Sequence, residues 1–165
     1  MKLLSLIFAM FMSSPLIPAS GAAMFFNDYF LDKTMRIDYY HSGDSKAEAV
    51  TLDQIFKYGI WAGSKNSLID NFNNGRYYVK IYDLASNKLI FSKGFDCYFG
   101  EYKTSSGAEK GIKRTYSESV LIPYPKNKIN FVLERRNKEN KMEELFSAEV
   151  DPNSIDVINE NPSGN

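Results

Sequence analysis

The sequence predicts an all-β fold, a β-sandwich of about seven strands with one short helix. The first observation is alternation: in residues 34–41 and 77–82, apolar and polar side chains follow one another as they do on half-buried strands. The second is spacing, because turn-forming residues recur roughly every ten positions, which is typical of sandwiches. The third is the scarcity of segments with helical periodicity, which leaves too few helices to cover a parallel sheet.

Length and charge limit the remaining choices. The chain has 165 residues, with 20 basic and 20 acidic side chains. A single domain over residues 24–152 is long enough to bury roughly two-thirds of its unfolded surface. Because the charges balance and no basic stripe is present, we expect no nucleic-acid partner.

Residues 1–23 have the pattern of a signal peptide. A single basic residue, Lys2, precedes an apolar run over residues 3–12, and small residues follow it. The run is about half of the roughly 20 residues that a membrane-spanning helix needs. We therefore expect cleavage, no membrane span in the mature chain, and a secreted or periplasmic location in a bacterium.

The first half of the mature chain contains most of the expected strands. Phe25 to Leu31 is an apolar, irregular stretch that we expect to pack over a sheet end. The expected strands that follow are residues 34–41, residues 47–60 running into a turn, and residues 77–82 and 88–94, with a short and weakly apolar segment at 67–72. Asn73-Asn74-Gly75 is typical of a hairpin turn, since both residue types tolerate positive φ.

The second half begins with the one expected helix. Phe95, Tyr98, Phe99 and Tyr102 have i, i+3, i+4, i+7 spacing, which places four aromatic rings on one helical face. We expect this helix to pack over the end of a sheet.

Three more strands are expected at residues 115–122, 128–135 and 142–150. Pro123 and Pro125 have no N–H to donate, which favours a sheet edge or a crossover for their segment. Residues 137–141 are predicted to form a hairpin tip, and residues 153–165 a flexible tail or truncated linker.

The reactive side chains give little sign of catalysis. The only histidine is His41, so this chain cannot form an HExxH zinc helix, a two-histidine metal site or a zinc finger. We expect His41 to be a solvated residue at a strand end rather than a catalytic base. Cys97 is the only cysteine, which excludes an internal disulfide. A small buried apolar role is favoured for Cys97 over a reactive thiol or an intermolecular link. We predict no catalytic, cofactor-binding or metal-binding residue.

Several short segments carry a resemblance to a known family. They are FNDYF at 26–30, DKTMRIDY at 32–39, SG at 42–43, WAG at 61–63, LIPYPK at 121–126 and VDP at 150–152. Together they resemble the N-terminal domain of the bacterial IgA metallopeptidase family, which are secreted zinc endopeptidases. The resemblance implies a β-sandwich-like module that precedes a separate zinc-peptidase domain. No catalytic or zinc residue of the family has a matching position in this sequence.

Two functions follow from these observations. The first is a non-catalytic accessory domain that packs on, or presents protein substrate to, a zinc-peptidase domain in cis or in trans that this chain lacks. The alternative is a stand-alone secreted module that binds carbohydrate or protein through exposed aromatic rings. The candidate interaction face for that alternative consists of Trp61, Tyr78, Tyr82 and Tyr124. A third class, an independent hydrolase with His41 as its base, has the weakest support.

On their predicted strand, Tyr78 and Tyr82 share the polar face with Arg76 and Lys80. This face would bind an extracellular protein or glycan, pack against a second domain, or be no more than amphipathic surface.

Overall fold

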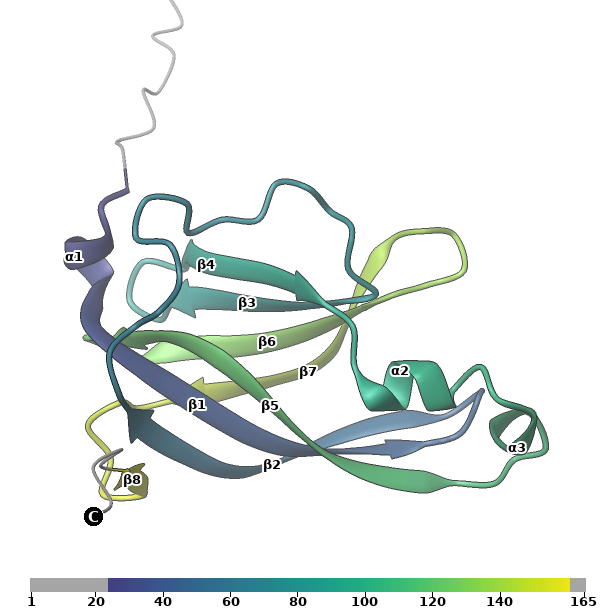
Figure 1. The fold of residues 1–165 in the computed structure, drawn as a ribbon. Helices are drawn as coiled ribbons and strands as arrows, with labels where there is room; N and C mark the ends of the chain where they lie inside the picture. Colours follow the sequence, from purple (N-terminus) through teal and green to yellow (C-terminus); the bar gives the residue numbers. More distant parts are fainter. Residues whose placement is uncertain (1–23, 161–165) are drawn as a thin grey trace, which may run out of the picture.

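Two four-stranded sheets pack face to face in the computed structural model, which describes residues 24–160 (Figure 1). The first sheet has the strand order β5-β1-β2-β8 and the second has β4-β3-β6-β7. Apolar side chains from both sheets form one continuous core between them. The all-β sandwich expected from the sequence is confirmed. The predicted signal peptide at 1–23 lies outside the described residues.

The described chain forms eight strands and three short helices, against about seven strands and one helix expected. In order, they are α1 (Phe26–Tyr29), β1 (Phe30–Gly43), β2 (Glu48–Tyr58), β3 (Tyr77–Asp83), β4 (Lys88–Phe95), α2 (Tyr98–Tyr102), α3 (Ser106–Glu109), β5 (Arg114–Pro125), β6 (Ile129–Arg136), β7 (Met142–Val150) and β8 (Val157–Asn159). None of the helices found between residues 24 and 160 is both long enough and apolar enough to cross a membrane.

The first sheet is built around β1, which pairs antiparallel with β2 on one side and β5 on the other. Met35, Ile37 and Tyr39 point into the core and are almost completely buried, as their alternation predicts. Strand β5 is an edge strand and contains Pro123 and Pro125. The edge position expected for these prolines is confirmed.

The second sheet places β3 between β4 and β6, with all neighbours antiparallel. The inward side chains of β3, Val79 and Ile81, are buried as predicted. Tyr78 lies on the opposite face and was expected to be exposed, but only 3% of it is accessible. Gly94 on β4 makes room for the Tyr78 ring, because a Cβ on Gly94 would lie 2.7 Å from it.

The segment between β2 and β3 is a long loop, so the hairpin expected at 73–75 is wrong. Leu68 is buried beneath this loop, and its carbonyl accepts a hydrogen bond from the Ser92 backbone N–H at 2.9 Å. Asn73 does adopt the positive φ (54°) that its sequence context indicates. Burial of Leu68 and the hydrogen bonds of Leu68 and Asp70 to Ser92 and Gly94 therefore fasten the loop to β4, and regular pairing does not form.

Helices α2 and α3 lie at the end of the sandwich away from α1 and β8 (Figure 1). The aromatic stripe is partly confirmed, because Phe99 and Tyr102 are buried while Tyr98 is 73% exposed and Phe95 belongs to β4. Gly100 allows the helix to approach β3 closely, since a Cβ there would lie 2.8 Å from the Tyr77 ring.

The stretch expected to be a flexible tail adds a strand to the first sheet. Residues of β8 pair parallel with Ile55, Phe56 and Lys57 of β2. Val157 is 9% exposed, and Glu160 forms an ion pair with Arg36 at 2.9 Å. Residues 157–160 are thus attached to the first sheet, and the flexible tail expected from residue 153 is wrong over this part.

The inter-sheet core should determine stability. Phe131 on β6 is fully buried, so Phe131→Ala is expected to lower the free energy of unfolding by about 3–5 kcal/mol through lost transfer energy and a cavity. Ile155→Ala is the control, because Ile155 is 98% exposed and should change stability by no more than about 0.5 kcal/mol. Urea unfolding followed by circular dichroism measures both, and equal effects would contradict this description of the core.

Candidate functional site

A buried cluster of ionisable side chains lies beneath α2. His41 lies on β1, Glu48 at the start of β2 and Glu118 on β5. Cys97 is the residue that caps the N-terminus of α2. His41 is only 2% exposed, so the expected solvated histidine is wrong. Strand β1 continues past His41, and α2 covers the imidazole with the Phe99 ring, stacked at 4.1 Å between centroids.

Each ring nitrogen of His41 faces a carboxylate. The Nδ1 atom lies 3.0 Å from Glu118 Oε2, and Nε2 lies 2.9 Å from Glu48 Oε1. Burial alone lowers the pKa of His41, but the hydrogen bonds to Cys97, Glu118 and Glu48 outweigh it and raise the pKa to about 10. The imidazole therefore carries both protons at neutral pH and donates one to each carboxylate.

Glu48 has a fully buried side chain and the largest number of partners in the cluster. Besides His41, it accepts hydrogen bonds from Tyr77 Oη at 2.8 Å, from Arg135 at 3.0 Å, and from the Lys103 ammonium. Burial raises the pKa of Glu48, and these hydrogen bonds lower it well below its ordinary value. The carboxylate is ionised, and three cations surround it.

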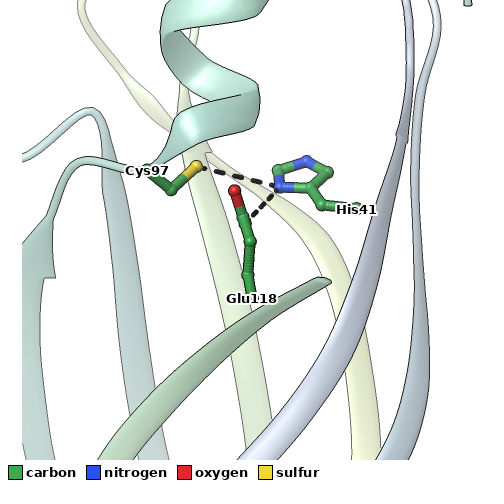
Figure 2. A group of neighbouring side chains, drawn as sticks. All are labelled: His41, Cys97 and Glu118. Atoms are coloured by element: carbon green, nitrogen blue, oxygen red, sulfur yellow. Dashed lines mark hydrogen bonds and ion pairs between the residues drawn. The ribbon is translucent and has the colours of Figure 1, made fainter. Parts of the chain in front are cut away.

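Glu118 and Cys97 complete the cluster next to the helix. Glu118 Oε1 accepts the Phe99 backbone N–H at 3.0 Å, while Cys97 Sγ accepts that of Gly100 at 3.4 Å and lies 3.9 Å from His41 Nδ1. Figure 2 shows the Cys97, His41 and Glu118 side chains converging from three elements. Burial raises the pKa of the Cys97 thiol. Cys97 is half-buried and in polar contact, unlike the small apolar residue expected.

A surface hollow of about 540 Å³ opens beside the cluster. Cys97 and Glu118 form part of its wall, together with Tyr39, Tyr98 and Ser117. Among residues 24–160, His41, Cys97 and Glu118 are also the group whose metal-ligating atoms all lie within 4.8 Å of one another. The sequence indicated no metal site, because the only histidine has no second histidine as a partner.

The cluster is poorly arranged for nucleophilic catalysis. A thiol nucleophile needs a neighbouring base to take its proton. His41 Nδ1 already carries a proton that it donates to Glu118, and the pKa of Cys97 is raised. The geometry therefore suits a buried ion-pair network or a metal site better than it suits a hydrolytic site.

The four aromatic residues of the candidate interaction face are not arranged as expected. Tyr78 and Tyr124 are 3% and 4% exposed, and Trp61 and Tyr82 are half-buried. Tyr124 lies in the core and donates its hydroxyl hydrogen to the Pro152 carbonyl. Tyr78 and Tyr124 therefore cannot offer their rings to a partner at this surface.

Sequence reasoning did not single out Glu48, Glu118, Lys103 or Arg135. A signal existed for Glu118, because it is in phase with Val120 and Ile122, which point into the core. A carboxylate at an inward position of a strand needs a buried partner. Neither Lys103 nor Arg135 has a comparable signal, since exposed basic residues are common near loops.

The charge on Glu48 should be essential for stability. Glu48→Gln keeps the size of the side chain but leaves the neighbouring cations without their shared anion, and we expect a loss of about 3–5 kcal/mol in the free energy of unfolding. Glu149→Gln is the matched control, because the Glu149 side chain is 56% exposed. Urea denaturation measures the unfolding midpoint of each variant. Equal midpoints for Glu48→Gln and Glu149→Gln would contradict this role of Glu48.

The state of His41 can be read directly, because it is the only histidine. In metal-free, tag-free protein labelled with ¹⁵N-histidine, we expect both ring nitrogens to stay protonated at neutral pH and to titrate near pH 10. The pKa in the folded state lies above the ordinary 6.5, so this contribution to stability is complete below about pH 6.5 and is lost as the pH rises through about 10. A titration midpoint near 6.5 would show that the two carboxylates do not hold the proton.

A comparison with models of protein families identifies a family to which this sequence is related. The model described as the peptidase M64 N-terminus matches residues 25–147. None of the curated proteins compared with the chain matches it. The matched region covers most of the described sandwich and supports a peptidase N-terminal domain, the coarser part of what the sequence resemblance implied. The chain therefore belongs to the peptidase M64 N-terminus family.

Proposed function

We propose that this chain is a non-catalytic accessory domain of a secreted zinc metallopeptidase. It would pack on a zinc-peptidase domain, in cis or in trans, or present protein substrate to it. The observation that carries the proposal is the family match over residues 25–147, which is to the N-terminal part of a peptidase. The finer resemblance to IgA metallopeptidases supports the same role.

The chemistry of the chain supports a non-catalytic role. A single histidine cannot supply the HExxH zinc helix of a metallopeptidase. That histidine is also held between Glu48 and Glu118 and has no free nitrogen to act as a base. Cleavage of a peptide bond would therefore depend on residues of another domain.

Residues 1–23 support a secreted or periplasmic location. Their basic start, apolar run and small residues are those of a signal for export. A peptidase partner in the same compartment would meet this domain after its export.

The surface beside β8 is the best candidate for contact with a peptidase domain. Helix α1 and strand β8, the first and last elements of the described chain, lie at the same end of the sandwich (Figure 1). Near β8, Tyr58 and Ile60 line a hollow together with Asn159 and Glu160, and Ile60 is 70% exposed. Lys33 and Lys57 line the same hollow, so exposed apolar side chains are bordered there by charged ones, which favours packing against another domain.

The test uses the zinc-peptidase domain encoded by an HExxH-bearing reading frame downstream of codon 165 or elsewhere in the same genome. We expect this chain to bind that domain in titration calorimetry and to change its chelator-sensitive cleavage of casein. Ile60→Asp should weaken binding by about tenfold or more, which is at least about 1.4 kcal/mol. Absence of both binding and an effect on cleavage would overturn the proposal.

The matched control is Phe72→Asp. Phe72 is 84% exposed and lies on the same loop as Ile60, but it lines the hollow that contains Trp61 and not the one beside β8. It should leave binding to the peptidase domain unchanged. Equal losses in the two variants would argue against the β8 surface as the site of contact.

The alternative of a stand-alone binding module has weaker support, because Tyr78 and Tyr124 are buried. What remains is a hollow of about 260 Å³ lined by Trp61 and Phe72. Under this alternative, Phe72→Asp rather than Ile60→Asp would reduce binding to an extracellular glycoprotein such as mucin. The same pair of variants therefore separates the two functions.

A further inference from the structure

We propose that His41 Nδ1, Cys97 Sγ and Glu118 Oε2 bind a Zn²⁺ ion, with a fourth coordination position open to the adjoining hollow. The three side chains come from β1, the cap of α2 and β5, and they point toward one another (Figure 2). This site is independent of the proposed accessory function, because it rests only on the geometry of this cluster.

The spacing of the three atoms fits tetrahedral zinc. Bond lengths of about 2.0–2.3 Å to nitrogen, oxygen and sulfur place neighbouring ligand atoms roughly 3.3–3.8 Å apart. Here Nδ1 lies 3.9 Å from Cys97 Sγ and 3.0 Å from Glu118 Oε2, and all three atoms lie within 4.8 Å of one another. Shifts of a few tenths of an ångström to an ångström would complete the coordination.

The surrounding contacts hold the ligands as a metal site requires. Histidines that bind metals usually donate their other ring N–H to a carboxylate, and His41 Nε2 faces Glu48 Oε1 at 2.9 Å. Glu48 is itself fixed by Arg135 and Lys103. Glu118 is anchored through Oε1 to the Phe99 N–H, and its Oε2 faces the His41 Nδ1 proton that the ion would replace.

Charge and ligand type select the ion. Binding would displace one proton from His41 Nδ1 and one from the Cys97 thiol, so Zn²⁺, the thiolate and the Glu118 carboxylate together would be neutral. A neutral set suits a buried site better than an isolated charge. Thiolate and imidazole favour Zn²⁺ over Ca²⁺ and Mg²⁺, which prefer six or more oxygen ligands.

The identity of residue 97 is a further reason to infer metal binding. Cys97 caps α2 by accepting the Gly100 N–H, a position at which Ser, Thr, Asp or Asn is preferred. The only cysteine of the chain therefore takes a place that a hydroxyl would fill well, next to an imidazole and a carboxylate. A thiol at this point adds a soft ligand, which a serine would not.

Cobalt is a suitable probe, because thiolate bound to Co²⁺ gives a charge-transfer absorption band. Tag-free protein would be stripped with EDTA, dialysed, kept reduced with a phosphine and titrated with Co²⁺. We expect a thiolate band that saturates at one equivalent and disappears when Zn²⁺ is added. No thiolate band in the wild-type protein would overturn the proposal without the need for any variant.

Variants then assign the ligands, with circular dichroism as a check on folding. Glu118→Gln can still accept the Phe99 N–H, yet it should weaken Zn²⁺ binding by at least the roughly 10–100-fold that loss of an outer partner costs. Cys97→Ser should lose the band and weaken Zn²⁺ binding at least as much. Asp96→Asn is the control, since the Asp96 side chain lines the same hollow but is 66% exposed.

Two results would contradict the assignment. One is unchanged Zn²⁺ affinity in folded Glu118→Gln or Cys97→Ser, which would place the ion on surface carboxylates. The other is an equal loss of affinity in Asp96→Asn. Loss in the first two variants, with the control unchanged, supports the site.

Discussion

The buried charge of Glu48 is the interaction on which the arrangement of the two sheets depends. Glu48 is the first residue of β2 in the first sheet, and Tyr77 and Arg135 donate hydrogen bonds to its carboxylate from β3 and β6 of the second. Lys103 reaches it from the residue after α2. Apolar contacts tolerate small displacements, but a buried anion that loses its partners costs several kcal/mol. The carboxylate therefore ties β2 of the first sheet to β3 and β6 of the second and to the end of α2.

The parts of the fold that the sequence predicts are those set by local pattern. The sequences of strands β1, β3 and β6 alternate clearly, and the hairpin tip at 137–141 contains Asn140, a residue type that accepts positive φ. The predictions failed where distant pairing decides the structure. Strand β8 is only three residues long, and it is a strand because β2 lies beside it. The loop before β3 resembles a hairpin locally, yet burial of Leu68 sets its course.

The site was harder to predict, because its members come together only in the folded chain. His41 meets residues that are 7, 56 and 77 positions away: Glu48, Cys97 and Glu118. A histidine at the end of a strand is usually solvated, and nothing near His41 in the sequence indicates that α2 will cover it. The inward phase of Glu118 was the one local sign of a buried charge in this region.

The two prolines of β5 limit how other chains can associate with this domain. An edge strand normally offers free N–H groups to any extended segment, which is a common route to aggregation and also to peptide capture by strand addition. Pro123 and Pro125 remove two donors from the outer end of β5. An extended polypeptide passing this domain would therefore find no continuous ladder along that part of β5, and its side chains would have to be recognised elsewhere on the surface.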